Sequence, residues 1–323
     1  MATPASEETR ELLIISQAEV ERLLDLDELL EALTTAFIEV TAGRISVPPR
    51  VAARTPRGLL GVMPGYLPGA GLESKLVAVF PGNHEHGLPS HLALIALFDE
   101  DTGSPLALMD GTYITAARTA AASALSTKLL ARREARVLAI LGAGVQGRAH
   151  LEALPRVRDF HEVRIASRSQ AHAEAFASTS ASARAMSDFE QAVRGADVVC
   201  CCTDASEPVI AFEWLEPGAH VTSIGSNPAG PELDADTVVG GHLFVESRVA
   251  FSPPPAGSAE LVGLDPAIAT ELGEVVTGAA PGRTGDDEIT VYKSMGHAVE
   301  DAAAARLAYE GALREGAGRR VSI

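Results

Sequence analysis

The pattern of apolar and polar positions changes several times along the 323-residue chain. Residues 16–42 carry apolar side chains at helical spacing, and Pro48 and Pro49 exclude a longer helix. Residues 50–110 consist of short β-rich runs separated by Gly, Pro and Asp turns, which is typical of an antiparallel sheet. The alanine-rich residues 112–132 predict a long helix that packs closely against other elements and links two domains.

A different pattern begins at residue 135. Buried strands and helices alternate up to about residue 250, and this alternation predicts a doubly wound parallel sheet of the Rossmann type. Ser187 and Glu190 form a predicted capping box at the start of one of these helices. Helical spacing returns near the end of the chain. The sequence therefore predicts an α/β protein with a Rossmann-type domain and a second α+β domain whose sheet is mainly antiparallel.

The charge and the cysteines narrow the classes of partner. The formal charge is −17, from 43 acidic and 26 basic residues, so neither nucleic acid nor an anionic membrane is an expected partner. The chain shows no apolar run of membrane-spanning length and no secretion signal, so we expect a cytoplasmic protein. The three cysteines are adjacent, at 200–202, so we interpret them as small apolar residues of a buried strand.

The first strand of the predicted Rossmann domain leads into Gly142-x-Gly144-x-x-Gly147 and a helix. Gly142 permits the tight turn, Gly144 lets the backbone approach a pyrophosphate, and Gly147 lets the helix pack closely on the sheet. The helix N-terminus, at Val145 and Gln146, supplies amide donors and a partial positive charge. This strand–turn–helix context predicts a dinucleotide site.

The end of the next strand bears on which dinucleotide binds. It offers Ser167, Arg168 and Ser169 where an acidic residue would bind the ribose of NAD, so NADP(H) is favoured and NAD(H) stays possible. The alternative is that Arg168 is a solvated loop charge. Thr203 follows a later strand and is expected at the nucleotide edge of the sheet, unless it is a plain turn residue.

Several motifs together, in order from about residue 45 to 310, resemble the ornithine cyclodeaminase/mu-crystallin family. The matching stretches include VPPR, MPGYL, KLVAVFPGNHEHGLPSH, ILGAGVQGRAHLEAL, GSNPAGPELDAD and SMGHAVEDAAAA. The resemblance implies NAD(P)-dependent redox chemistry at a C–N bond of amino or imino acids. It also implies a homodimer that pairs its non-Rossmann sheets, with residues 1–124, completed by about 300–323, forming the substrate and dimerisation domain and 125–299 forming the Rossmann domain.

Three cations stand in apolar surroundings, where a charge is costly unless it meets an anion. They are Arg50, Lys75 and Arg118. Internal ion pairing is the alternative explanation, but the resemblance implies that all three hold the substrate carboxylate. It further implies that Met63 and Met295 line the substrate pocket and that the following residues lie near the cofactor: Ser90, Arg118, Thr119, Ser223, Ile224 and Ser294.

Two departures from the family pattern favour reduction. Gly61 stands where cyclodeaminases hold a distal amine with an acid, and Asn227 stands where an Asp serves as general acid/base. Asn does not exchange protons near neutral pH, and reducing an imine needs a base far less than oxidising an amine does. We therefore expect a reductase of imino acids or cyclic ketimines whose pocket has no carboxylate to exchange protons.

The candidate catalytic residues are Lys75, Asn227 and His297, of which His297 is the candidate proton donor and is otherwise a packed helix residue. No metal site is expected, since the histidines at 84, 86 and 91 lack the spacing of a helical zinc motif. The alternative functions are an ornithine or lysine cyclodeaminase, an amino acid dehydrogenase, and a non-catalytic NADPH-dependent small-ligand-binding protein.

Overall fold

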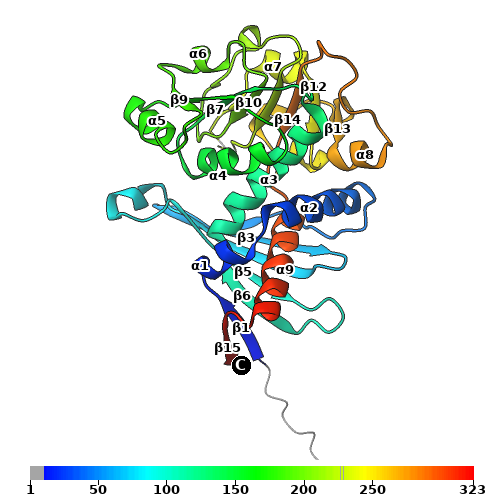
Figure 1. The fold of residues 1–323 in the computed structure, drawn as a ribbon. Helices are drawn as coiled ribbons and strands as arrows, with labels where there is room; N and C mark the ends of the chain where they lie inside the picture. Colours follow the sequence, from blue (N-terminus) through cyan, green and yellow to red (C-terminus); the bar gives the residue numbers. More distant parts are fainter. Residues whose placement is uncertain (1–10, 226, 228) are drawn as a thin grey trace, which may run out of the picture.

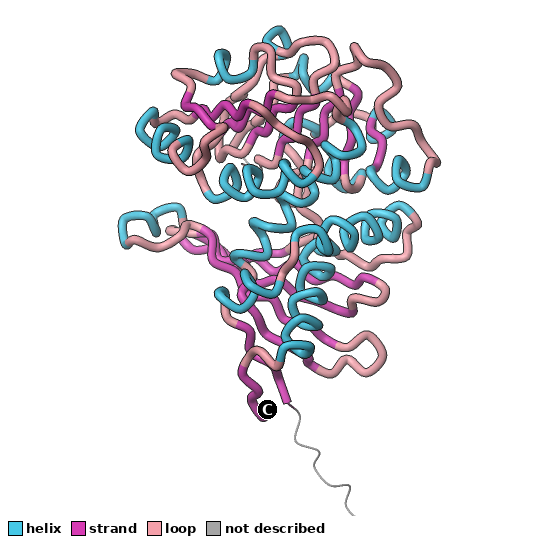
Figure 2. Tube along the Cα trace, viewed as in Figure 1, coloured by secondary structure: helices cyan, strands magenta, loops and turns pink. Residues whose placement is uncertain are grey.

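The protein is built around two β-sheets, which lie one above the other in Figure 1. The computed structural model describes residues 11–225, 227 and 229–323. Helix α3 (Thr112–Leu130) runs between the two sheets, and the tube view of Figure 2 shows the same division. Of the helices in these described residues, none has an apolar stretch that could cross a lipid bilayer.

The lower sheet has seven strands in the order β15-β1-β6-β5-β4-β3-β2. Every neighbouring pair is antiparallel except β1 and β6, which are parallel, so the expected mainly antiparallel sheet is present. The strands are β1 (Glu11–Ile15), β2 (Val51–Thr55), β3 (Gly58–Leu67), β4 (Gly71–Val79), β5 (His91–Phe98), β6 (Pro105–Asp110) and β15 (Arg319–Ser322).

Within the described residues, helices cover one face of the lower sheet. Its strands contact α1 (Gln17–Leu23), α9 (Ala298–Glu315) and α3, and α2 (Leu26–Thr41) packs on α3 and α9. The predicted N-terminal helix is therefore two helices, because Asp25 caps a new start by accepting from the N–H groups of Asp27 and Glu28. Small residues allow close packing here: a Cβ on Gly65 of β3 would lie 2.9 Å from the Cβ of Ala298.

The upper sheet has eight strands in the order β13-β12-β14-β11-β10-β7-β8-β9, and all of its neighbouring pairs are parallel. The strands are β7 (Val137–Leu141), β8 (Glu162–Ala166), β9 (Ala183–Ala185), β10 (Val198–Cys201), β11 (His220–Ser223), β12 (His242–Val245), β13 (Ala269–Glu271) and β14 (Thr290–Lys293). The helices are α4 (Val145–Ala153), α5 (Gln170–Ala177), α6 (Phe189–Val193), α7 (Ala235–Gly240) and α8 (Leu272–Thr277). The predicted doubly wound sheet is confirmed.

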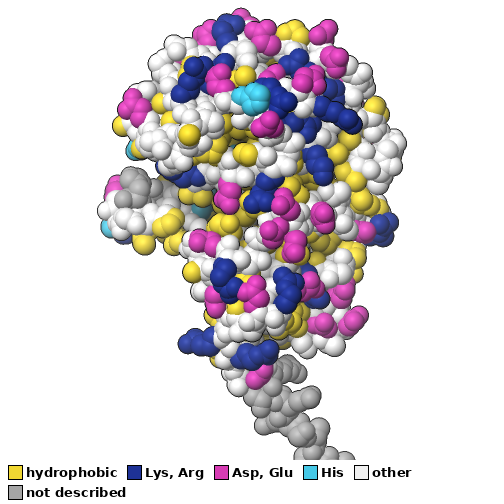
Figure 3. All heavy atoms as spheres, in the orientation of Figure 1, with side chains coloured by type: hydrophobic (Ala, Val, Ile, Leu, Met, Phe, Trp, Pro, Cys, Tyr) yellow, Lys and Arg dark blue, Asp and Glu magenta, His cyan; other side chains and the backbone are white. Residues whose placement is uncertain are grey.

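Helix α3 is buried almost all round, from Ile114 to Leu130, which explains its alanine-rich sequence. It packs against α2 and α9 below and against α4 above. The predicted domain boundary at 124/125 falls inside this continuous helix and stays a prediction. Figure 3 shows acidic and basic side chains interspersed over the visible face of the molecule.

One predicted cap was misplaced by a residue. The N-cap of α6 is Asp188, whose carboxylate accepts from the Gln191 N–H at 2.8 Å, while Ser187 donates its hydroxyl to Asp188. The predicted capping box at Ser187 is therefore wrong. Both residue types cap helices well, and spacing alone did not separate them.

Candidate active site

The glycine-rich turn lies between β7 and α4, and two of its glycines have no room for a side chain. Gly142 has a φ of 118°, and a Cβ there would lie 2.4 Å from the Cys202 carbonyl oxygen. A Cβ on Gly147 would lie 2.1 Å from the Gly142 carbonyl oxygen. By contrast, a Cβ on Gly144 meets no atom within 4 Å, so this backbone borders open space at the start of α4. The turn therefore fits a dinucleotide pyrophosphate, which needs close access to the backbone and to the helix amides at Val145 and Gln146.

The end of β8 carries the predicted ribose-phosphate residues. Ser169 caps α5, and its N–H donates to the Ser167 hydroxyl. Arg168 is exposed and makes no ion pair with any of the residues that the structure describes. A guanidinium at this strand end is thus free to meet an anion.

A buried network that sequence reasoning missed holds the neighbouring strand ends together. The Glu232 carboxylate accepts from the N–H and hydroxyl of Thr203, and from the Ser223 hydroxyl and the Gly225 N–H, at 2.6–2.8 Å. Lys293, the last residue of β14, donates to the Ser223 hydroxyl, the Gly225 carbonyl and Glu260. These contacts fix the loop that begins at Ile224, on the carboxyl edge where a nicotinamide is expected.

Asn227 lies in that loop. Its side-chain N–H donates to the Asp204 carbonyl at 3.1 Å, and its side-chain oxygen accepts from the Ala229 N–H at 2.9 Å. The amide thus holds the loop through backbone contacts. Ser226 and Pro228, on either side of it, lie outside the described residues.

Lys75 and Arg118 lie side by side against α9. Lys75 donates to Asp301 at 2.7 Å, and Arg118 donates to Asp301 at 3.0 Å and to Glu300 at 2.8 Å. All four side chains are at least 95% buried. Internal ion pairing, the alternative considered from sequence, is therefore realised for these two cations.

The pKa values follow from this arrangement. Burial lowers the pKa of Lys75, although Asp301 opposes the shift. Burial alone would lower the pKa of Arg118, but Asp301 and Glu300 raise it on balance. Burial would raise the pKa of Asp301, but the two cations outweigh it and hold that pKa below its usual range.

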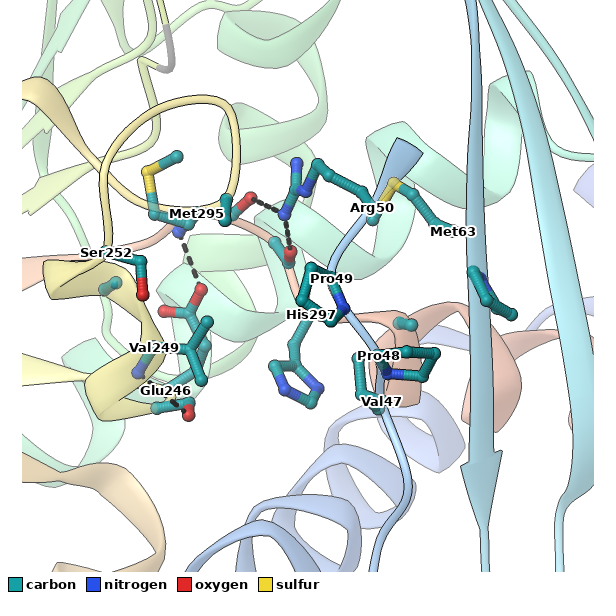
Figure 4. Close-up of a pocket in the computed structure, with 16 residues that line it drawn as sticks. Val47, Pro48, Pro49, Arg50, Met63, Glu246, Val249, Ser252, Met295 and His297 are labelled. Carbon is teal, nitrogen blue, oxygen red and sulfur yellow. Dashed lines mark hydrogen bonds between the residues drawn. The ribbon is translucent and has the colours of Figure 1, made fainter. Parts of the chain in front are cut away.

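Arg50 is the third cation, and it differs from the other two. It donates to the carbonyl oxygens of Met295 and Gly296, at 3.4 and 3.0 Å, and makes no ion pair with a carboxylate in the described part of the chain. It lines a cavity of about 340 Å³ between the two sheets, together with Met63, Met295 and His297 (Figure 4). Most of the remaining lining is apolar, including Pro48, Pro49, Val249 and Ala250.

The three cations near this cavity differ in their partners. Arg50, Lys75 and Arg118 face two carboxylates that are paired with cations, Asp301 and Glu300. Glu73 on β4 is also buried nearby, but both its oxygens lack a partner, and burial followed by the Asp301 charge raises its pKa well above the usual range. Arg50 is the one of these three cations without a carboxylate partner in the described part of the chain, and a guanidinium at a cavity wall suits an anionic ligand.

The cavity also contains a carboxyl group. Glu246, the first residue after β12, lines it and accepts from the Met295 N–H at 2.7 Å. A carboxyl group therefore does line this cavity, contrary to the expectation of a pocket without one. A single acid at the end of an apolar strand, HLFVE, was the available signal.

His297 is the N-cap of α9, and its Nδ1 accepts from the Val299 N–H. Burial, reinforced by Arg50, lowers its pKa to about 4, so the ring is neutral near pH 7. This weighs against His297 as the proton donor.

The remaining predicted residues are distributed as follows. Ser294 is buried, and its N–H donates to the Ser223 carbonyl. Thr119 is buried in α3 next to Arg118. Ser90 bonds to Nδ1 of His91. Burial lowers the pKa of His91, Asp204 opposes this shift and Lys75 adds to it, so both charged groups lie near the ring. The β4–β5 hairpin therefore brings Ser90 toward the nucleotide edge of the upper sheet.

Comparisons with known proteins agree with this arrangement. The profile of the Ornithine cyclodeaminase/mu-crystallin family matches residues 10–316. The ketimine reductase mu-crystallin of Mus musculus is 44% identical over 87% of this chain and 90% of its own. The Δ1-pyrroline-2-carboxylate reductase of Thermococcus litoralis, solved with NADH and L-proline, superposes with a TM-score of 0.89 at 36% identity, over 96% of this chain and all of the other. An archaeal alanine dehydrogenase dimer with bound NAD superposes with a TM-score of 0.86 at 36% identity, over 97% and 99% of the two chains. The chain therefore belongs to the ornithine cyclodeaminase/mu-crystallin family.

Proposed function

We propose that the protein is an NAD(P)H-dependent oxidoreductase that reduces the C=N bond of imino acids and cyclic ketimines. The observation that carries this proposal is the position of Arg50, which lines the interdomain cavity without a carboxylate partner among the described residues, next to a strand edge shaped for a dinucleotide. The relatives named as a ketimine reductase and a pyrroline-2-carboxylate reductase support it. When bound, a reduced nicotinamide supplies the hydride, and the chain's own residues bind and orient the substrate and exclude water.

Arg50 is the proposed primary ligand of the substrate carboxylate, because it lines the cavity and no described carboxylate neutralises it. Lys75 and Arg118 would have a secondary role, because Asp301 and Glu300 already bind them and offset their charge. The proposed substrate side chain lies along the apolar lining, with Met63 and Met295 in contact with it.

Two positions favour reduction over cyclodeamination. Gly61 lies two residues from Met63 on the same face of β3, and it has no side chain with which to hold a distal ammonium group. Asn227 is engaged with the backbone of its own loop and of Asp204 and cannot act as a base.

The test is a screen of NADPH and NADH consumption with Δ1-pyrroline-2-carboxylate, Δ1-piperideine-2-carboxylate, and 2-oxo acids mixed with methylamine. We expect turnover of at least one cyclic imino acid, and about a 10²-fold or greater loss of kcat/KM in Arg50→Met, because a charge-assisted contact is removed. Arg54→Met, on the exposed strand β2, is the matched control and should keep wild-type kinetics. Formation of proline and ammonia from ornithine and NAD, without imine reduction, would contradict the proposal.

We further propose that NADP(H) is preferred over NAD(H). The support is the unpaired, exposed Arg168 between two serines at the end of β8. Arg168→Gln should weaken NADPH binding about tenfold or more and leave NADH binding nearly unchanged, as measured by nucleotide fluorescence titration. Equal losses for both nucleotides would refute the preference.

A homodimer is the third part of the proposal. The face of the lower sheet that the helices leave uncovered carries five large apolar side chains that are each at least 40% exposed: Val51, Leu60, Leu72, Leu92 and Leu94. A patch of this kind marks a protein–protein interface more often than a free surface.

A further inference from the structure

The cavity carboxyl of Glu246 has no role in the function proposed so far. The residue is 2% exposed, and one oxygen, Oε1, accepts from the Met295 N–H. The other oxygen, Oε2, is buried and has no hydrogen-bond partner among the described residues. Figure 4 shows this carboxyl across the cavity from Pro49 and His297. A buried polar atom without a partner is costly, and a ligand in the cavity is the available partner for it.

Glu246 and Arg50 are tied to the same residue. The carboxyl accepts from the N–H of Met295, and the guanidinium donates to the C=O of Met295. The acid and the cation therefore stand at the two ends of one residue. In an α-imino acid the carboxylate and the imine nitrogen are both attached to one carbon, so a substrate held at Arg50 brings its nitrogen toward Glu246.

The surroundings raise the pKa of this acid. Burial, followed by the charge of Glu300 on α9, raises the pKa of Glu246 to about 7, while the Met295 N–H and Arg118 of α3 oppose the shift. The charge of Glu246 in turn acts to raise the pKa of two further titratable groups, Arg50 just before β2 and Tyr292 of β14. A donor whose pKa lies near the working pH is the most effective general acid.

We propose that Glu246 is the catalytic proton donor to the imine nitrogen, an inference that rests on the proposed reductase function. The O–H bond of the carboxyl breaks as the N–H bond of the iminium forms. A bound reduced nicotinamide would supply the hydride for the new C–H bond, and the C=N π pair would become the nitrogen lone pair of the product. A proton from the solvent would then restore the carboxyl before the next turnover.

The kinetic test compares Glu246→Gln, Glu246→Asp and a control. Gln keeps an oxygen for the Met295 N–H but has no proton to give. Glu271→Gln is the matched control, because Glu271 is a buried acid on the adjacent strand β13 whose two oxygens accept from the Arg248 N–H and the Thr41 hydroxyl outside the cavity. Thermal denaturation and NADPH titration establish that each variant folds and binds nucleotide.

For the wild type, we expect kcat/KM to fall as the pH rises through about 7, where Glu246 loses its proton. Glu246→Gln should lose about 10²-fold or more at pH 6 and lack that decline, Glu246→Asp should recover part of the rate, and the control should match the wild type. Titration of the imine itself affects every variant equally. A wild-type pH profile in Glu246→Gln, or a loss confined to substrates with a distal ammonium, would overturn the inference.

A binding measurement gives a readout that does not depend on turnover. Calorimetry of pyrrole-2-carboxylate binding at pH 7, in buffers of different ionisation enthalpy, reports the protons taken up. An anionic ligand raises the pKa of a nearby acid, so we expect proton uptake in the wild type and the control and none in Glu246→Gln. If Glu246→Gln takes up as many protons as the wild type, the role of Glu246 is refuted but the proposed function is not. If the wild type reduces no imine, the proposed function is refuted as well.

Discussion

Asp301 is the residue on which two buried cations depend. Its two oxygens bind Lys75 and Arg118, and none of the three side chains is more than 5% exposed. Asp301→Asn leaves a buried positive charge without its counterion, which costs about 3–5 kcal/mol. We expect a loss of this size in the free energy of unfolding, measured by urea denaturation.

The control for this prediction lies on the same helix. Glu310 pairs with Arg306 at 2.7 Å on the exposed surface of α9, and such pairs contribute only about 0.3–0.5 kcal/mol. Glu310→Gln should therefore change the unfolding free energy by no more than this amount. Equal effects of the two substitutions would show that the Asp301 ion pairs do not stabilise the fold.

Two buried histidines predict acid sensitivity. Burial lowers the pKa of His150 to about 4 and that of His220 to about 3, so both are neutral in the folded protein, whereas the ordinary value of 6.5 applies after unfolding. Between pH 6.5 and 4 the unfolded chain binds more protons, and the free energy of unfolding therefore falls as the pH falls. Their stabilising contribution is complete above pH 6.5.

The measurement is the urea midpoint between pH 7.5 and 4.5. His150→Gln should make its pH dependence shallower, whereas His161→Gln, at a ring with a 67% exposed side chain, should not. If the urea midpoint of His150→Gln depends on pH as steeply as that of the wild type, buried neutral His150 is not a source of the acid sensitivity.

Sequence reasoning located individual cations better than their partners. Lys75 and Arg118 stood out as charges in apolar segments, but Asp301, 226 positions after Lys75, stood out only as part of a matching motif. The same argument, applied to the acidic pair Glu300–Asp301 among alanines and to Lys293 at the end of an apolar strand, would have indicated both buried networks. Which acid meets which cation depends on the tertiary fold.

Two glycines of the turn between β7 and α4 have different roles, one in folding and the other in nucleotide binding. A Cβ on Gly147 overlaps the Gly142 carbonyl oxygen, so Gly147→Ala should displace α4, lower the melting temperature and abolish NADPH binding. A Cβ on Gly144 meets no protein atom, so Gly144→Ala should leave the melting temperature nearly unchanged and weaken NADPH binding, because the methyl group occupies the space expected for the pyrophosphate. Full NADPH affinity in Gly144→Ala would place the nucleotide elsewhere.

Periodicity predicted the helices and strands because each buries one face or is buried throughout. It did not place a boundary inside residues 16–42, where apolar spacing continues across the Asp25 cap between α1 and α2. Nor did it reveal that β1 and β15, from opposite ends of the chain, pair at the edge of the lower sheet. The family resemblance implied only that both chain ends belong to the same domain.

At the scale of the whole molecule, the uncovered face of the lower sheet is the proposed dimer interface. Leu60 and Leu94 lie on that face, 46% and 47% exposed, with strand β4 between them. The double variant Leu60→Glu/Leu94→Glu should shift a dimer to monomer in analytical ultracentrifugation, because a dimer interface buries these positions and would desolvate the new charges. Val239→Glu, at a 70% exposed position on α7, is the control. A double variant with the sedimentation of the wild type would exclude this face as the interface.

Arg50 already holds two peptide oxygens, those of Met295 and Gly296. A ligand at the proposed Arg50 site would compete with the protein's own backbone for the same N–H groups. A carboxylate would displace these carbonyl oxygens, because its full charge binds a guanidinium more strongly than a carbonyl dipole does. A carboxamide offers only another carbonyl and gains nothing, so the protein would discriminate between an acid and its amide without any group that repels the amide.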